Sequence, residues 1–227
     1  MRVIAALVAG LVISAQALAL DLGSLSNADA GRGLKDALTQ GSAVAISKLG
    51  AENGFLGNDK VRIPLPDTLK RVEGMLRMLG MQKQAEELVV AMNRAAEQAV
   101  PLAKPLLVNA VKNMSWQDAK GILAGNDTAA TEYFRRTTSD QLTEKFLPIV
   151  TKATAKVGLA EKYNEIAGKG AKLGLVDAKQ ARIETYVTQK TLDGLFVMMA
   201  EQEKAIRADP IGAATAMARK VFGLATK

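Results

Sequence analysis

Three polar residues near the middle of the chain, Asn93, Arg94 and Glu97, have types and spacing that suit either a binding pocket or a structural network. They follow Met92 in a stretch that is otherwise rich in leucine, valine and alanine. On a helix, Asn93 and Glu97 would lie one turn apart on the same face. Polar groups beside an apolar core need partners, so these side chains either line a ligand pocket or lock helices together. The structural network is the more frequent arrangement, and the pocket is retained as a candidate binding site.

A second candidate binding site lies between Asp127 and Arg136. Glu132, Tyr133 and Arg135 follow a glycine turn there and could form a charged rim beside an aromatic wall. Arginine can hold a carboxylate or phosphate through two parallel hydrogen bonds, which would suit an anionic head group. The more frequent alternative is a solvated helix face with two aromatic side chains in the core.

The chain has no histidine and no cysteine. Histidine is the commonest general base near neutral pH and, with cysteine, supplies most zinc ligands, so serine–histidine triads and zinc sites are excluded. Disulfides and thiolate chemistry are excluded as well. The sequence therefore predicts no catalytic residue, no metal site and no cofactor, and an enzyme would depend on carboxylates, lysines, tyrosines or oxygen-coordinated metals such as calcium or magnesium.

The other motifs with chemical interest have simpler interpretations. The acidic pairs Glu86–Glu87 and Glu201/Glu203 lack a spacing that would place two carboxyl groups on one helical face, so we interpret them as solubilising charge. The segment Gly168–Gly174 has glycines and lysines like a phosphate-binding loop, but Ser or Thr does not follow Gly-Lys and no strand precedes it. We expect a flexible basic linker there.

The elements that must position these residues are helices. Alanine, leucine, lysine and glutamate are abundant, aromatic residues make up 4% of the chain, and no segment sustains the alternation of a strand. The predicted helices run from Ser26 to about Leu49, along a stripe of Leu69, Val72, Leu76 and Leu79 that Gly80 ends, and from about Gln84 to Met114. Between the first two, Val61–Pro66 must be extended because proline disfavours helical geometry in the preceding residue. Pro101 and Pro105 predict one kinked helix or two nearly collinear ones.

The second half of the chain is predicted to contain further helices. A capping box, Ser115 with Asp118, opens a short helix that Gly125 closes. The remaining predictions are a helix through Tyr133–Phe134, another capped by Ser139, a short one at Glu161–Ile166, a long one at Arg182–Arg207 and a last one at Asp209–Phe222.

The N-terminus has the layout of a secretory signal. Met1–Arg2 precedes an apolar run from Val3 to Ile13 and then Ala17–Leu18–Ala19, a small-x-small peptidase site. An uncleaved membrane anchor would need about twenty apolar residues, and Ser14 and Gln16 interrupt the run. We therefore predict a signal peptide at residues 1–19, a periplasmic location, and a single all-helical domain at residues 20–227 that forms a multi-helix bundle without a transmembrane segment.

Several stretches together resemble a bacterial family of exported proteins catalogued as domain of unknown function 4197. The similar stretches are Gly31–Lys35 with Ala37–Leu38, Gly54–Leu56, Val61–Pro66, Met92–Glu97, Asp118–Lys120, Ala129–Thr131 with Tyr133–Phe134, Leu192–Phe196, Glu203, Ile206–Arg207 and Asp209–Pro210. The resemblance implies an exported, helical, single-domain protein with no established activity. It implies no catalytic or binding residue.

Taken together, the sequence predicts a non-enzymatic exported protein whose helices bind a hydrophobic or amphiphilic small molecule, such as a lipid, or an envelope protein. The net charge of +7 favours anionic envelope lipid or polymer as a partner, and an exported chain is not expected to meet nucleic acid. One alternative is a carboxylate-dependent cell-wall hydrolase, which requires two carboxyl groups in one cleft. The other is a structural envelope scaffold, which requires a solid core and an exposed apolar patch.

Overall fold

The computed structural model describes residues 27–174, 176–177 and 180–208, and this part of the chain is all-α, as the sequence predicts. The elements are α1 (Asn27–Gly50), α2 (Asp67–Arg71), α3 (Glu73–Met78), α4 (Gln82–Ala99), the 3-10 helix η2 (Val100–Leu102), α5 (Ala103–Lys112), α6 (Trp116–Ala124), α7 (Ala129–Thr154), α8 (Gly158–Lys172) and α9 (Ile183–Ala208). The predicted signal peptide, the predicted cap at Ser26 and the predicted helix Asp209–Phe222 lie outside the described residues.

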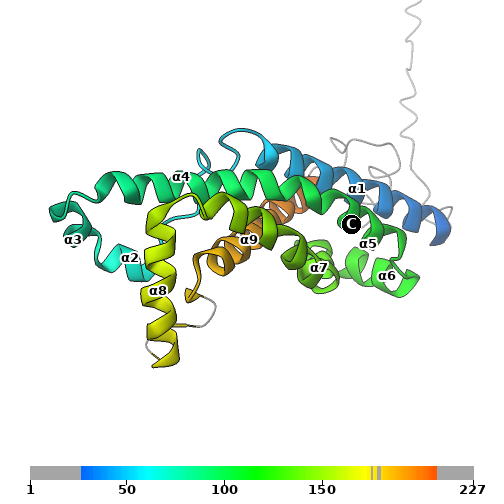
Figure 1. The fold of residues 1–227 in the computed structure, drawn as a ribbon. Coiled ribbons are helices and arrows are strands. Elements are labelled where there is room, and N and C mark those ends of the chain that lie inside the picture. The colour runs from blue at the N-terminus through cyan, green and yellow to red at the C-terminus, as the bar shows by residue number, and fades with distance from the viewer. Residues whose placement is uncertain (1–26, 175, 178–179, 209–227) are drawn as a thin grey trace, which may run out of the picture.

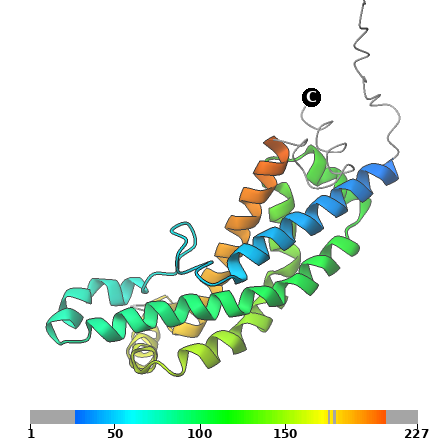
Figure 2. The same cartoon turned by 90° about the horizontal axis from the view of Figure 1, so that it is seen from above.

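The long helices build the core. Helix α7 packs against α9 and α4, while α1 packs against α9 and α5 (Figures 1 and 2). Their apolar faces form one continuous buried cluster, whose largest fully buried side chains include Phe55, Phe134, Phe146 and Phe196. In the centre of α9, Leu195, Phe196, Met198 and Met199 are buried, whereas Val197 faces outwards.

The prediction for the two prolines after α4 is confirmed. Helix α4, η2 and α5 follow one another end to end (Figure 2), with Pro101 in the short 3-10 turn and Pro105 in the first turn of α5. Proline lacks the N–H that an α-helical hydrogen bond needs, so the chain tightens locally and then resumes its helix.

Two predictions for the second half of the chain are wrong. Ser139 does not begin a helix, because α7 is continuous from Ala129 to Thr154 and the Ser139 hydroxyl donates to the Arg135 carbonyl at 2.6 Å within it. The expected short helix and basic linker are instead α8, which reaches Lys172 and buries Tyr163 and Ala167 on one face. The predicted capping box of Ser115 and Asp118 is confirmed at the start of α6.

The predicted apolar stripe before Gly80 is only half buried. The helix breaks at Val72 into α2 and α3, and only Leu69 and Leu76 of the stripe are buried, while Val72 and Leu79 are exposed. Gly80 ends the helix as predicted, with a φ of +67°. The N–H of Met81 donates to the Leu76 carbonyl and that of Gly80 to the Arg77 carbonyl, the hydrogen-bond pattern that closes a helix on a left-handed glycine.

Among the described residues, no helix combines the length and the apolar character needed to cross a membrane.

Candidate functional site

Glu97 fastens the loop between α1 and α2 onto α4. Its buried carboxylate accepts hydrogen bonds from the backbone N–H groups of Phe55 and Leu56, each at 3.1 Å, through Oε1. Arg94 donates to the other carboxylate oxygen at 2.6 Å and to Asn53 Oδ1 at 3.0 Å. All the partners that a buried carboxylate needs are therefore supplied by the protein itself.

Asn93 binds the same loop one turn earlier on α4. Its side-chain oxygen accepts from the Ile63 N–H at 2.8 Å, and its amide nitrogen donates to the Ile63 carbonyl at 2.9 Å and the Val89 carbonyl at 2.8 Å. The side-chain amide thus pairs with an extended segment as a neighbouring strand would. The structure brings Asn93, Arg94 and Glu97 together as the network that holds the loop in place.

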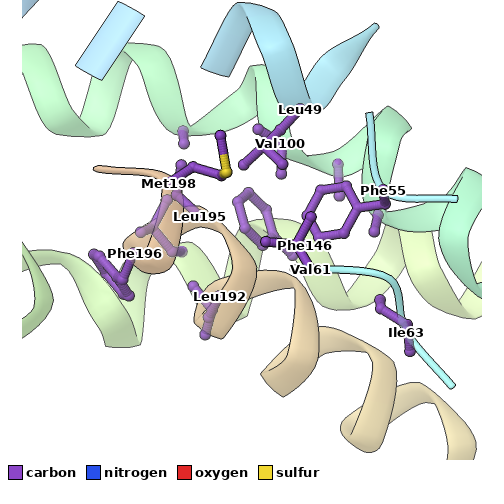
Figure 3. Packing of buried hydrophobic residues seen from close by; sticks show 14 of the residues in the cluster. Leu49, Phe55, Val61, Ile63, Val100, Phe146, Leu192, Leu195, Phe196 and Met198 are labelled. Atoms are coloured by element: carbon purple, nitrogen blue, oxygen red, sulfur yellow. The ribbon is translucent and has the colours of Figure 1, made fainter. Parts of the chain in front are cut away.

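The loop is also held by a close contact with α9. Phe55 points into the core beside Phe146 (Figure 3), and its ring lies against Gly194. A Cβ at position 194 would stand 2.6 Å from Phe55 Cε1, so a larger residue would collide with the ring. The loop is therefore held by α4 through hydrogen bonds and by α9 through packing.

A second buried glutamate joins α9 to the start of α7, and here the interpretation as solubilising charge is wrong. Glu203 accepts from the N–H groups of Ala130 and Thr131, each at 2.9 Å, and from the Thr131 hydroxyl at 2.8 Å. Arg207 donates to the same carboxylate at 2.9 Å and to the Ile122 carbonyl at 2.9 Å. A carboxylate at a helix N-terminus satisfies orphan N–H groups and complements the helix dipole, so Glu203 caps α7 from another helix.

The three residues of the second predicted binding site have different contacts on α7. Tyr133 is buried and its hydroxyl donates to the Ala110 carbonyl at 2.8 Å. Glu132 accepts from the Thr128 hydroxyl at 3.0 Å at the exposed start of α7. Arg135 lies over the Phe196 ring, 4.5 Å from its centroid, and faces Asp193 on α9. Tyr133 therefore contacts α5, Glu132 contacts the residue before α7, and Arg135 contacts α9.

Each buried glutamate among the described residues is engaged by groups of the protein itself. Glu97 and Glu203 are occupied as above, and Glu184, the other buried glutamate described, accepts from the Asn164 amide at 2.9 Å. Hydrogen bonding by Ser115 lowers the pKa of Asp118, and Lys169 lowers that of Glu165, whereas a general acid needs a raised pKa. No cluster of three or more acidic side chains that could hold a metal ion occurs among the described residues.

A hollow at the surface lies beside α4. A groove of about 520 Å³ separates α2 and α3 from α4, and we name it the α2–α4 groove. Its lining residues are Arg62, Pro64, Leu65, Lys70, Glu73, Leu76, Arg77, Gln82, Ala85, Glu86, Val89 and Val90. By contrast, a hollow between α1, α7 and α9 measures about 20 Å³, which is the scale of one water molecule.

Charges of both signs surround an apolar floor in this groove. Leu65, Leu76 and Val89 contribute to the floor, and Arg62, Lys70 and Arg77 supply cations against Glu73 and Glu86. Within the described part of the chain, no ion pair involves Arg62 or Arg77, whereas Lys70 lies 3.7 Å from Asp67. Glu86 accepts from Gln82 at 2.9 Å. The groove therefore combines apolar area with two guanidinium groups that have donors to spare.

Sequence reasoning did not find the groove. Its residues come from the extended segment, from α2 and α3 and from α4, and no single stretch has a motif for it. The sequence signal that could have indicated a groove was the extended Val61–Pro66 next to the apolar stripe of Leu69 and Leu76. Which face of α4 opposes α2 and α3 depends, however, on how the chain turns at Gly80. Of the predicted residues, Arg94 lies in a different and smaller hollow of about 350 Å³, with Lys152 and Lys156.

Comparison with known proteins gives one match. A family model described as "Protein of unknown function (DUF4197)" matches residues 24–223. No curated protein and no solved structure matches the chain. Some of the stretches that carry the resemblance are joined by hydrogen bonds. Asn93 and Glu97 bind the stretches Val61–Pro66 and Gly54–Leu56, and Glu203, with Arg207, binds Ala129–Thr131.

Proposed function

The chain belongs to the DUF4197 family, and we propose that it is an exported helical protein that binds a small anionic amphiphile in the α2–α4 groove. The observation that supports this function is the coexistence, in a groove of about 520 Å³, of an apolar floor with unpaired arginines. Ligand sites of this kind are concave, mostly apolar and carry a few polar groups that orient the ligand.

The chemistry of the lining defines the ligand class. Leu65, Leu76, Val89 and Val90 offer apolar area to a hydrocarbon portion. Arg62 and Arg77 can each donate two hydrogen bonds to a carboxylate or a phosphate. The ligand that fits is a molecule with one acidic head group and a short or folded apolar tail.

The groove is a better site than the core or the buried glutamates. The hollow between α1, α7 and α9 is about 20 Å³, so an amphiphile could enter it only if these helices moved apart. The carboxylates of Glu97 and Glu203 already accept from backbone N–H groups. The location that fits this function is the bacterial envelope, and residues 1–19 support it as a signal peptide.

Native mass spectrometry of the purified protein tests the proposal, first as isolated and then titrated with lysophosphatidylglycerol below its micelle concentration. We expect a co-purified or added amphiphile to bind with one-to-one stoichiometry. Val90→Trp should abolish binding because the indole fills the groove, and Arg62→Gln should weaken it by about tenfold because a charged hydrogen bond is lost.

Matched variants separate loss of the site from loss of the fold. Val90 and Val197 are 43% and 40% exposed, so Val197→Trp on α9 places the same side chain outside the groove and should bind normally. Lys145→Gln on α7 is the control for Arg62→Gln. A clean apo mass, with no amphiphile gained during the titration, would contradict ligand binding and favour the scaffold alternative.

A further inference from the structure

The turn between α3 and α4 presents an apolar surface that no described helix covers. In the segment Gly74–Ala85, which we name the apical hairpin, Met75, Met78 and Leu79 are 56%, 83% and 66% exposed. Leu76, on the adjacent face of α3, is buried, so the helix has one face in the core and another left in solvent. Adjacent large apolar side chains at such exposure mark an interaction surface more often than chance.

The hairpin projects from one end of the molecule. In Figure 1, α3 lies at the left edge of the molecule, where the chain turns back from α2 and α3 into α4. The left-handed Gly80 and the hydrogen bond from Met81 to Leu76 make the turn tight, so Met78 and Leu79 stand at its tip. A protruding tip can enter a flat surface without any change in the helices behind it.

The charges of the hairpin indicate what kind of surface it meets. Gly74–Ala85 contains Arg77 and Lys83 and no carboxylate, and the acidic residues nearest in sequence are Glu73 and Glu86 on either side. Lys70 and Arg71 add two cations on α2. Among the described residues, Arg71, Arg77 and Lys83 take part in no ion pair, so their charges are available to an anionic partner.

We propose that the apical hairpin docks the protein on an anionic membrane surface, with Met75, Met78 and Leu79 in the acyl boundary and Arg71, Arg77 and Lys83 at the lipid phosphates. Apolar side chains flanked by cations are the combination that holds helices in the interfacial region of a bilayer. Methionine suits this role because its flexible side chain adapts to an irregular environment. Arg77 also lines the α2–α4 groove, whereas Met78 and Leu79 do not, so variants of the apolar tip test membrane docking separately from ligand binding.

The test is co-sedimentation with vesicles of phosphatidylglycerol and phosphatidylethanolamine, compared with vesicles of phosphatidylcholine alone. Wild type and variants share the same N-terminus, so any contribution of the apolar run at residues 3–13 cancels. We expect binding to the anionic vesicles that weakens as salt is raised, because mobile ions screen the phosphates. Met78→Ser/Leu79→Ser should reduce the partition coefficient by at least about tenfold, because two apolar side chains no longer enter the bilayer.

The charge contribution is measured separately. Arg77→Gln/Lys83→Gln should lower binding to anionic vesicles by about fivefold for each cation removed and leave any binding to phosphatidylcholine unchanged. The control Lys145→Gln/Lys204→Gln removes two exposed cations outside the hairpin. It should lower binding to anionic vesicles less than Arg77→Gln/Lys83→Gln does, because it changes only the net charge.

A matched apolar control exists on α8. Ile166 and Leu173 are 67% and 74% exposed, so Ile166→Ser/Leu173→Ser removes similar exposed area away from the hairpin and should bind vesicles as wild type does. Equal binding by the Met78/Leu79 variant and wild type would overturn the proposal. So would a wild-type dimer that the same variant dissociates without any vesicle binding, since the hairpin would then be a protein interface.

The two proposals fail in different experiments. Val90→Trp should lose the amphiphile and keep vesicle binding, because Val90 lies in the groove and outside Gly74–Ala85. Met78→Ser/Leu79→Ser should lose vesicle binding and keep the amphiphile, because neither residue lines the groove.

Discussion

At the scale of single residues, the polar groups that look functional in the sequence hold the fold together. Asn93 and Glu97 are buried and bind backbone groups of the loop before α2, and Glu203 binds backbone groups at the start of α7. Burying a carboxylate is costly unless it is paired and hydrogen-bonded, and both glutamates have an arginine and two backbone N–H donors. These residues should therefore affect stability before they affect binding.

Glu97→Gln tests this role. The substitution keeps the size of the side chain but removes its charge and turns one acceptor into a donor, which cannot satisfy both the N–H groups and Arg94. We expect a loss of about 3 kcal/mol in the free energy of unfolding, measured by urea denaturation. Glu87→Gln, an exposed substitution on the same helix, should change it by less than about 0.5 kcal/mol. If Glu97→Gln and Glu87→Gln had the same free energy of unfolding, the hydrogen bonds of Glu97 would contribute nothing to stability.

The tyrosines give a pH-dependent prediction. The chain has three tyrosines, and each hydroxyl donates to a backbone carbonyl, Tyr133 to Ala110, Tyr163 to Gln180 and Tyr186 to Pro64. Burial raises the pKa of all three and takes that of Tyr186 to about 12. Because the pKa of Tyr186 is higher in the folded state than in the unfolded state, its neutral hydroxyl contributes to folding stability. That contribution is complete below the unfolded pKa near 10 and is lost as the pH rises towards 12.

Ultraviolet titration of the phenolate band measures this effect. The native protein should show little phenolate at pH values where free tyrosine is half ionised, and the missing absorbance should appear on denaturation in urea. Half ionisation of all three tyrosines near pH 10 in the folded protein would contradict their burial.

At the scale of the elements, the loop between α1 and α2 depends on close contact with α9. Phe55 packs against Gly194, and α9 can approach the loop only because position 194 lacks a side chain. The extended segment that follows is then aligned along α4 by Asn93. One element thus determines where another, distant in sequence, can lie.

Gly194→Ala should therefore destabilise the protein although alanine favours helices. The new Cβ would stand 2.6 Å from the Phe55 ring, and displacing that ring should lower the free energy of unfolding by about 1–3 kcal/mol. Gly121→Ala in α6 is the control, since nothing lies within 4 Å of a Cβ there, and it should stabilise by about 0.5–1 kcal/mol.

A double variant checks the cause. Phe55→Leu removes the atoms that collide, so Gly194→Ala should cost less in that background than in wild type, as chemical denaturation of the four proteins would show. If the two substitutions changed the free energy of unfolding additively, the contact between Phe55 and position 194 would not be the cause of the destabilisation.

At the scale of the whole molecule, the long helices share one buried cluster while the apical hairpin and α8 extend from it. The cluster includes side chains from α1, α4, α5, α7, α8 and α9, so these helices share one core. Cooperative unfolding follows when the apolar contacts of each element depend on the others.

We expect a single unfolding transition. The only tryptophan, Trp116, starts α6 and lies near Gly31 of α1, so its fluorescence reports on one edge of the bundle, while far-ultraviolet circular dichroism reports on all helices. Their midpoints in urea should coincide. Separate midpoints would show that α6 and its neighbours unfold independently of the rest.

The helical content, the capping box at Ser115, the helix end at Gly80 and the near-collinear α4 and α5 follow from the sequence, because caps, prolines and glycines act within a few residues. The tertiary structure alone decided that Glu203 is buried, that Tyr133 and Arg135 face different ways, and that Met78 and Leu79 are exposed. Glu97 meets Phe55 across 42 positions and Glu203 meets Ala130 across 73. Such contacts depend on how whole helices pack, and the groove and the hairpin surface are what that packing leaves uncovered.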